Sequence, residues 1–205
     1  MKLKVCGLSN PLEVEFCVNN EVNYCGFILN YPKSHRFISR DKAKNLTEIY
    51  KANSKFVGVL VEPTEEELNN FSKLDFDYFQ LYGNYNVEKL NKIKKKFNKK
   101  IIATIQVKKR DDVNNYKQIE NGSDIILWDS SGYEKSLNWD YNWIKLISTK
   151  VEKMIAGNIT INKLNELVGL ADIVDVSGAL ETNKVKDIIK IKNFITEFKK
   201  INHAN

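Results

Sequence analysis

Residues 56–83, FVGVLVEPTEEELNNFSKLDFDYFQLYG, contain one complete strand–helix–strand unit. Residues 56–61 and 78–82 are short and almost continuously apolar, which is typical of strands covered on both faces. Between them, residues 63–67 (PTEEE) resemble a helix N-cap followed by an acidic first turn, which predicts the start of a helix. Two buried strands joined by a helix pair in parallel through a right-handed crossover.

The same alternation continues in both directions along the chain. Apolar runs predict eight strands, at residues 3–6, 24–29, 56–61, 78–82, 101–107, 125–128, 154–156 and 173–176. Helical spacing predicts helices between them, at residues 12–18, 43–50, from 63 onward, 87–97, 111–119, 140–147, 161–168 and 184–198.

Eight such units in 205 residues leave no room for a second domain. Eight is the number that closes a parallel sheet into a barrel, so the predicted fold class is α/β, a single (β/α)8 TIM barrel over residues 1–205. An open doubly wound sheet is the alternative, and it would carry the sequence G-x-G-x-x-G after the first strand. Residues 6–10, CGLSN, do not match that sequence.

The composition is that of a folded, soluble protein, with 42% hydrophobic and 28% charged residues. Three cysteines cannot all pair with one another, which favours a reducing compartment. No apolar run reaches the roughly 18 residues of a membrane-spanning helix, and the first residues, MKLKVC, do not resemble a signal peptide. We therefore expect a cytoplasmic protein that has no membrane partner.

The charge pattern indicates the kind of ligand. The formal net charge is +6, yet only three of the 32 basic residues are arginines. Proteins that read nucleic acids rely on arginine for bidentate contacts, so no nucleic-acid partner is expected. A mild positive field suits a small anionic substrate. The sequence has no metal-ligand spacing, nicotinamide fingerprint or Walker A loop, so neither a metal nor a cofactor is expected.

Reactive side chains lie at the carboxyl ends of the predicted strands. In (β/α)8 barrels the active site is at this end. Cys6 closes the first strand and Asp129 the sixth. Cys6 as a base would need nearby positive charge, because a thiol with a pKa near ~8.5 is mostly protonated at pH 7. Asp129 as an acid would need a pKa above the usual ~3.9, and burial beside Trp128 is the expected cause. A buried apolar cysteine and an N-cap or loop aspartate stay open as alternatives.

The loops after the seventh and eighth strands carry small residues, at Gly157-Asn158 and Ser177-Gly178. Backbone N–H groups in these two loops hold a phosphate in many barrels of this type, although such residues also occur in plain tight turns. The other cysteines are interpreted as buried apolar residues. His35 is expected in an exposed loop, and His203 in a frayed tail.

Taken in order, these motifs resemble the phosphoribosylanthranilate isomerase family over essentially the whole chain. The matching segments are residues 4–7 (KVCG), 26–29 (GFIL), 32–39 (PKSHRFIS), 57–61 (VGVLV), 80–83 (QLYG), 129 (D), 132–139 (GYEKSLNW), 156–158 (AGN) and 175–181 (DVSGALE).

The resemblance implies an Amadori rearrangement of N-(5-phosphoribosyl)anthranilate, by a protein that acts as a monomer or a homodimer. It implies that Asp129 is the general acid and Cys6 the general base. It also implies that Arg36 faces the anthranilate carboxylate. The other substrate-binding residues that it implies are Gln80, Gly157, Asn158, Asp175, Ser177 and Gly178.

The sequence departs from the family pattern at four places. Tyr82 replaces a histidine, Glu134 a glycine and Asn158 a second glycine, and one serine before Gly178 is missing. Two other functions stay open. One is a related aminoaldose–ketose isomerase, such as that of histidine biosynthesis, whose family has Asp where Cys6 stands. The other is a non-catalytic barrel that binds a phosphorylated ligand or RNA.

Overall fold

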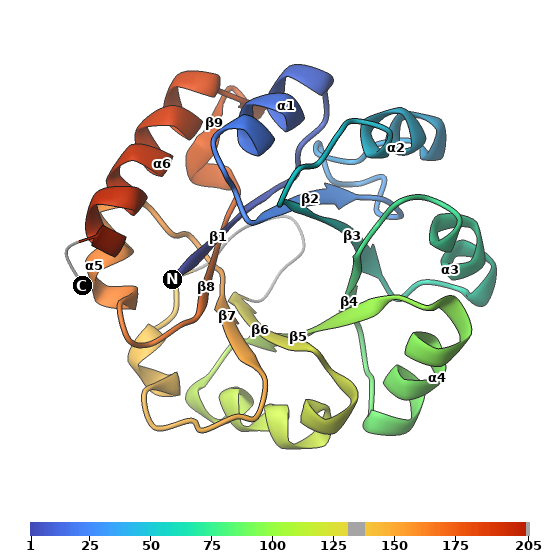
Figure 1. Cartoon of the computed structure of the whole chain (residues 1–205). Coiled ribbons are helices and arrows are strands. Elements are labelled where there is room, and N and C mark those ends of the chain that lie inside the picture. The colour runs from blue at the N-terminus through green and yellow to red at the C-terminus, as the bar shows by residue number, and fades with distance from the viewer. Residues whose placement is uncertain (131–137, 204–205) are drawn as a thin grey trace.

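The computed structural model describes residues 1–130 and 138–203 of the chain. Eight parallel strands pair in chain order, and the last pairs with the first to close a barrel (Figure 1). The strands are β1 (Lys2–Cys6), β2 (Tyr24–Ile28), β3 (Lys55–Val61), β4 (Tyr78–Tyr82), β5 (Lys100–Val107), β6 (Ile125–Ser130), β7 (Glu152–Ile155) and β8 (Ile173–Val176). The predicted (β/α)8 barrel is confirmed, and the open doubly wound sheet is excluded.

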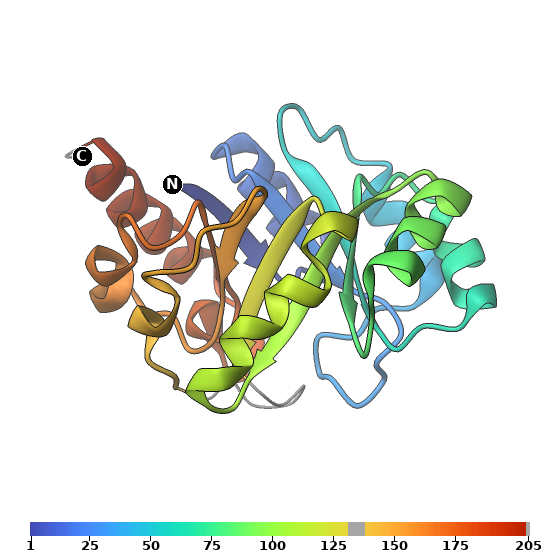
Figure 2. The same ribbon diagram turned by 90° about the horizontal axis from the view of Figure 1, so that it is seen from below.

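Helical segments surround the barrel, and Figure 2 shows them flanking the strands from the side. The α-helices are α1 (Pro11–Asn19), α2 (Arg40–Thr47), α3 (Glu65–Ser72), α4 (Val87–Phe97), α5 (Leu164–Leu167) and α6 (Ile188–His203). The 3₁₀ helices are η1 (Arg110–Gln118), η2 (Glu120–Gly122), η3 (Tyr141–Ile144), η4 (Ile161–Lys163) and η5 (Gly178–Leu180). No helix within the described residues has the length and apolarity needed to cross a membrane.

The helices of the second half differ from the prediction. The predicted helices at residues 111–119 and 140–147 overlap the 3₁₀ helices η1 and η3 instead of α-helices, and residues 161–168 contain only a short α-helix after η4. Within η1 only Val113 is buried, so little packing stabilises a regular helix there. Its Asp and Asn side chains also compete for backbone hydrogen bonds, which disfavours an α-helix.

The helix predicted at residues 184–198 is wrong at its start. Residues 181–186 form a hairpin of two short strands, β9 (Glu181–Thr182) and β10 (Val185–Lys186), and α6 follows. The turn residues Asn183 and Lys184 have φ values of 51° and 65°. Two consecutive left-handed residues are what a tight two-residue hairpin turn requires.

The end of the described chain is also more ordered than predicted, because α6 continues to His203. The side chain of Asn202 accepts a hydrogen bond from the Met1 amino group at 3.1 Å and donates one to the Met1 carbonyl at 2.7 Å. These two bonds fix the end of α6 beside the start of β1.

The barrel wall separates two apolar clusters, because successive residues of a strand face opposite sides. In β1, Leu3 and Val5 belong to the outer cluster, whereas Cys6 belongs to the inner one. Lys4 lies two residues before Cys6, on the same side of the strand, and is fully buried. The interior of the barrel therefore contains a charged side chain directly below Cys6.

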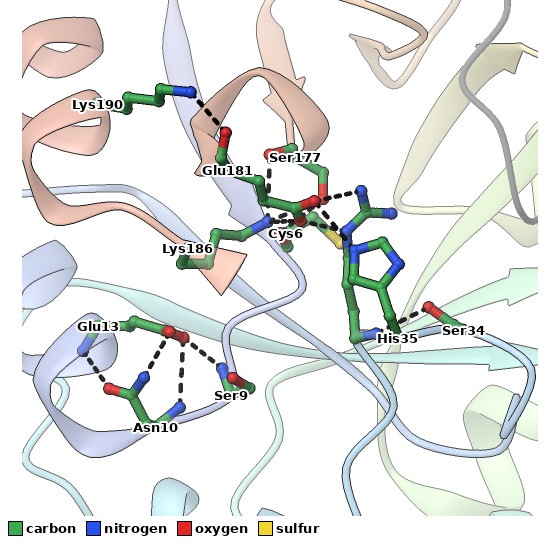
Figure 3. Close-up of polar contacts among 11 residues, drawn as sticks. Cys6, Ser9, Asn10, Glu13, Ser34, His35, Ser177, Glu181, Lys186 and Lys190 are labelled. Atoms are coloured by element: carbon green, nitrogen blue, oxygen red, sulfur yellow. Dashed lines mark hydrogen bonds and ion pairs between the residues drawn. The ribbon is translucent and has the colours of Figure 1, made fainter. Parts of the chain in front are cut away.

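A capping box fixes the start of α1, close to the end of β1. Glu13 is 1% exposed, and its carboxylate accepts hydrogen bonds from the backbone of Ser9 at 2.6 Å and from the side chain of Asn10 at 2.5 Å. The Asn10 side chain in turn accepts a hydrogen bond from the Glu13 backbone at 3.1 Å (Figure 3). The box thus satisfies backbone donors that the first turn of a helix leaves free.

We expect Glu13→Ala to lower the free energy of unfolding by about 1–2 kcal/mol, because the hydrogen bonds that its carboxylate accepts from Ser9 and Asn10 are lost. Urea denaturation followed by circular dichroism measures this change. Glu15→Ala is the matched control, since Glu15 is an exposed residue of the same helix. Equal stability of the two variants would contradict the role given to Glu13.

Candidate active site

A cavity of about 110 Å³ opens at the carboxyl ends of the strands. The side chain or backbone of most predicted site residues lines it, namely Cys6, Arg36, Asp129, Gly157, Asn158, Asp175, Ser177 and Gly178. Gln80 is the exception, because it is 1% exposed and lies beneath Tyr82 rather than in the cavity wall. The strand-end positions are brought together as the barrel prediction requires.

Cys6 lies at the end of β1 and is 8% exposed. Burial raises the pKa of the Cys6 thiol, and the ammonium groups of Lys4 and Lys186 act in the opposite direction. These two lysines supply the positive charge that a thiolate base needs. Gly26 leaves room for the sulfur, because a Cβ at this position would lie 2.9 Å from the Cys6 Sγ.

Lys4 pairs with Asp175 across the closure of the barrel. The two residues are register partners in β1 and β8, and the Lys4 Nζ lies 2.7 Å from the Asp175 Oδ2. Burial alone would lower the pKa of Lys4, but Asp175 and Cys6 hold it above its usual value. The Asp175 Oδ1 is buried and has no hydrogen-bond partner among the described residues. That oxygen can accept a hydrogen bond from a ligand in the cavity.

Asp129 lies in β6 and points into the cavity. Burial raises the pKa of this carboxyl group to about 6, although a hydrogen bond from Tyr82 counteracts part of the rise. Trp128 is not the cause that the sequence suggested. It faces the outer cluster and donates a hydrogen bond from its indole to the Val113 carbonyl at 3.0 Å. The interior of the barrel itself buries Asp129.

Tyr82 connects Asp129 with Gln80 inside the barrel. Its hydroxyl donates to the Asp129 Oδ2 at 2.7 Å and accepts from the Gln80 Nε2 at 3.2 Å. A hydroxyl donor favours the ionised form of a carboxyl group. The hydrogen bond from Tyr82 therefore keeps the pKa of Asp129 lower than burial alone would make it.

We expect Tyr82→Phe to raise the pKa of Asp129 by about one to two units. A hydrogen bond to a charged group contributes about 1.5–3 kcal/mol, and one pKa unit corresponds to about 1.4 kcal/mol. Carbon-13 NMR titration of labelled aspartate carboxyl groups measures the pKa, and the Asp129→Asn spectrum assigns the signal. Tyr24→Phe removes a hydroxyl at the start of β2, at the other end of the barrel, and serves as control. An unchanged Asp129 pKa in Tyr82→Phe would contradict this role.

The loop after β7 contains two consecutive residues with positive φ. Gly157 has a φ of 105° and Asn158 a φ of 49°. A Cβ at Gly157 would lie 2.8 Å from the Trp139 indole nitrogen, so glycine is required there. The Lys163 ammonium contacts the Asn158 carbonyl at 3.2 Å and adds positive charge beside this loop.

Ser177 and Gly178 follow β8, the strand that pairs with β7 in the barrel. The Ser177 hydroxyl donates to the Cys6 carbonyl at 2.9 Å and lies 3.2 Å from the Lys186 ammonium. Its side chain therefore ties the loop after β8 to the end of β1.

Arg36 reaches the cavity from the loop after β2. Its side chain lies against Gly7, which has a φ of 78° and at which a Cβ would overlap the arginine stem. The guanidinium forms a bidentate pair with Glu181, through Nε and through Nη2, the latter at 3.0 Å. His35 is exposed, as predicted, and also contacts Glu181, at 3.0 Å.

Several polar residues near the cavity were not predicted from the sequence as functional. They are Lys4, Lys163, Glu181 and Lys186. Period-two alternation places Lys4 on the same face as Cys6, so this signal was available. The segment 132–137, with Glu134, lies outside the described residues. Within the part of the chain that the structure describes, no three His, Cys, Asp or Glu side chains are grouped as metal ligands would be.

Comparison with known proteins gives matches over nearly the full length. A family model for N-(5'-phosphoribosyl)anthranilate isomerase matches residues 3–197. The enzyme of that name from Streptococcus mutans is 32% identical over 204 residues, which cover 97% of this chain and 99% of the relative. The one from Rhizobium johnstonii is 29% identical, with 98% and 95% covered.

Solved structures agree with the sequence comparison. Phosphoribosylanthranilate isomerase from Thermotoga maritima has a TM-score of 0.84 at 25% identity, covering 98% of this chain and 99% of that one. A second structure of such an isomerase, in complex with reduced 1-(o-carboxyphenylamino)-1-deoxyribulose 5-phosphate, has a TM-score of 0.80 at 25% identity with the same coverage. This chain belongs to the N-(5'-phosphoribosyl)anthranilate isomerase family.

Proposed function

We propose that the protein catalyses the Amadori rearrangement of N-(5-phosphoribosyl)anthranilate to 1-(2-carboxyphenylamino)-1-deoxyribulose 5-phosphate, a step of tryptophan biosynthesis. The observation that carries the proposal is that Cys6 and Asp129, from β1 and β6, line one cavity. Opening of the sugar ring needs one acid and removal of the C2 proton needs one base, so proton transfers alone convert the aminoaldose to the aminoketose and no cofactor is needed.

Asp129 acts first, as the general acid. Its carboxyl group protonates the furanose ring oxygen, the bond from that oxygen to C1 breaks, and the anilino nitrogen lone pair forms an iminium at C1. A pKa of about 6 keeps a useful fraction of Asp129 protonated near neutral pH. The hydroxyl of Tyr82 stabilises the carboxylate that remains after the transfer.

Cys6 acts second, as the general base. The iminium acidifies the hydrogen on C2, and the Cys6 thiolate removes that proton. The electron pair of the C2–H bond neutralises the iminium and gives an enolamine. Tautomerisation, in which C1 gains a proton and the C2 hydroxyl loses one, then gives the ketone. Lys4 and Lys186 stabilise the thiolate in its buried position.

The remaining residues orient the substrate. The phosphate is expected on backbone N–H groups around Gly157, Asn158, Ser177 and Gly178, with Lys163 supplying further positive charge. The anthranilate carboxylate is expected at Arg36. Asp175 offers its unpaired oxygen to a substrate hydroxyl or N–H group. Gln80 contributes through Tyr82 rather than by direct contact.

The compartment, the charge of the substrate and the oligomeric state are inferred from the sequence. We infer a cytoplasmic enzyme with a small anionic substrate, acting as a monomer or homodimer. A similar structure, with a TM-score of 0.81 at 25% identity over 98% of this chain and 99% of that one, is of monomers generated from the dimeric phosphoribosylanthranilate isomerase of Thermotoga maritima.

The decisive experiment follows the fluorescence of phosphoribosylanthranilate during incubation with the purified protein. Turnover by the wild type, with loss of turnover in Asp129→Asn, is the expected result. The aminoaldose substrate of the related histidine-biosynthesis isomerase is tested in parallel. Turnover of that compound alone would identify the related reaction, and no turnover of either would favour a non-catalytic binding barrel.

A further inference from the structure

A buried charge cluster lies beside the cavity, at the start of the β9–β10 hairpin. The Glu181 carboxylate is its centre, with 9% of the side chain exposed. It accepts hydrogen bonds from Arg36, from His35 at 3.0 Å and from Lys186 at 2.6 Å (Figure 3). Burial alone would raise the pKa of Glu181, but Arg36 and Lys186 lower it to about 2, so the group is ionised at neutral pH.

Lys186 is the most deeply buried member of this cluster, with 1% of its side chain exposed. Besides Glu181, its ammonium contacts the Ser177 carbonyl at 3.1 Å and the Ser177 hydroxyl at 3.2 Å. A buried ammonium is costly unless its hydrogen bonds are satisfied, and here it has three oxygen partners. The cluster thereby joins the hairpin to the loop after β8.

The charges of this cluster do not cancel. Glu181 carries one negative charge, and it is shared between the two cations Arg36 and Lys186. The three groups together keep a net charge of +1. If Lys186 were neutral, the Arg36–Glu181 pair would carry no net charge and would attract an anion only weakly.

The geometry of Arg36 is equally constrained. Glu181 binds its Nε and Nη2, which fixes the plane of the guanidinium. Gly7 lies against the stem, and a Cβ at Gly178 would be 3.5 Å from Nη2. The guanidinium is therefore held between the loops after β1 and β8, facing the cavity.

We propose that Glu181 and Lys186 are positioning residues for carboxylate recognition. Glu181 fixes the orientation of Arg36 at the cavity, and Lys186 preserves the positive charge that Glu181 would otherwise cancel. The proposal rests on the proposed function, because the carboxylate it concerns is that of the anthranilate ring. In this proposal, the preference for a substrate with a ring carboxylate depends on Glu181 and Lys186, although neither side chain needs to contact the substrate.

The test compares two lysines that both contact Glu181. Lys186 contacts its carboxylate, whereas Lys190 donates to its backbone carbonyl at 2.6 Å. Steady-state kinetics are measured with phosphoribosylanthranilate and with the analogue made from aniline, which lacks the carboxylate. We expect Lys186→Met to raise KM for the carboxylated substrate about tenfold, with a much smaller change for the analogue. Lys190→Met should leave the ratio of the two KM values unchanged.

A double-mutant cycle tests the same idea without removing Lys186. Glu181→Gln should raise KM for the carboxylated substrate in the wild-type background and have no further effect in an Arg36→Met background. If Lys186→Met does not fold, as judged by circular dichroism, this cycle still tests the role of Glu181, and Lys186→Gln replaces Lys186→Met in the comparison of the two substrates.

The outcomes separate the inference from the function on which it rests. Equal KM changes for both substrates in Lys186→Met, or additive effects of Glu181→Gln and Arg36→Met, would overturn the inference while turnover persists. A wild type that converts neither substrate would instead remove the proposed function.

Discussion

Asp129→Asn is expected to lower kcat by about 10²- to 10⁴-fold, the usual effect of losing a general acid. At pH 7, a carboxyl group with a pKa of about 6 is protonated in roughly one molecule in ten, whereas one with a pKa of 3.9 is protonated in about one in a thousand. Burial thus supplies the protonated form, and an amide has no comparable acidic proton. Stopped assays and substrate fluorescence measure the loss, and KM should change little because the side chain keeps its shape.

The same substitution is expected to stabilise the fold near neutral pH. The pKa of Asp129 is higher in the folded protein, at about 6, than in the unfolded chain. Its contribution to stability is therefore full below pH 4 and is lost as the pH rises through about 6. Asparagine has no such loss, so Asp129→Asn should gain about 1–3 kcal/mol at pH 7 relative to the wild type.

Denaturant unfolding at pH 7 and at pH 4 checks both the sign and the pH window. The advantage of the variant should shrink strongly at pH 4, where the wild-type carboxyl group is almost fully protonated in the folded protein and about half protonated in the unfolded chain. A variant that is less stable than the wild type at pH 7 would mean that its inactivity reflects damage to the fold, and the assignment of Asp129 as acid would lose its support.

The barrel was predictable because each strand is buried on both faces and therefore reads as a continuous apolar run. The run at residues 78–82 matches β4 to the residue, and that at 173–176 matches β8. The hairpin at residues 181–186 was missed because its turn uses Asn183 and Lys184 in left-handed backbone. The usual signal for such a turn is a glycine, and none occurs there.

The strand-end residues of the site were predictable for a related reason, since the carboxyl ends of parallel strands share one edge of the barrel. Their partners were not. Lys4 pairs with Asp175, 171 residues away, and that contact exists only because β8 closes the barrel onto β1. Glu181 and Lys186 likewise acquire their partners from the hairpin fold and not from any local spacing.

Cys6→Ser is expected to lower kcat by about 10²- to 10⁴-fold, because a serine hydroxyl is not ionised at pH 7 and cannot replace a thiolate base. The variant keeps a small side chain beside Gly26 and keeps the backbone carbonyl that accepts from Ser177. Single-turnover and steady-state fluorescence assays measure the effect. Cys17→Ala is the control, since Cys17 is a buried thiol in α1 outside the cavity.

Cys6→Asp tests the assignment of Cys6 as general base more specifically than Cys6→Ser, through the pH dependence of kcat/KM. The active wild-type form has Asp129 protonated and Cys6 ionised. Burial holds the pKa of the Cys6 thiol above its ordinary value despite the counteracting lysines. From about pH 6, the pKa of Asp129, up to the higher pKa of Cys6, the gain in thiolate therefore offsets the loss of protonated Asp129, and kcat/KM should be flat.

In Cys6→Asp the base is a carboxylate that is already ionised, so nothing offsets the loss of protonated Asp129. Its kcat/KM should fall about tenfold per pH unit above roughly pH 6. Titration of the substrate phosphate affects both proteins alike and cancels in the comparison. A wild-type profile that falls in the same way from pH 6 would show that no group with a high pKa takes the C2 proton, and Cys6 would not be the base.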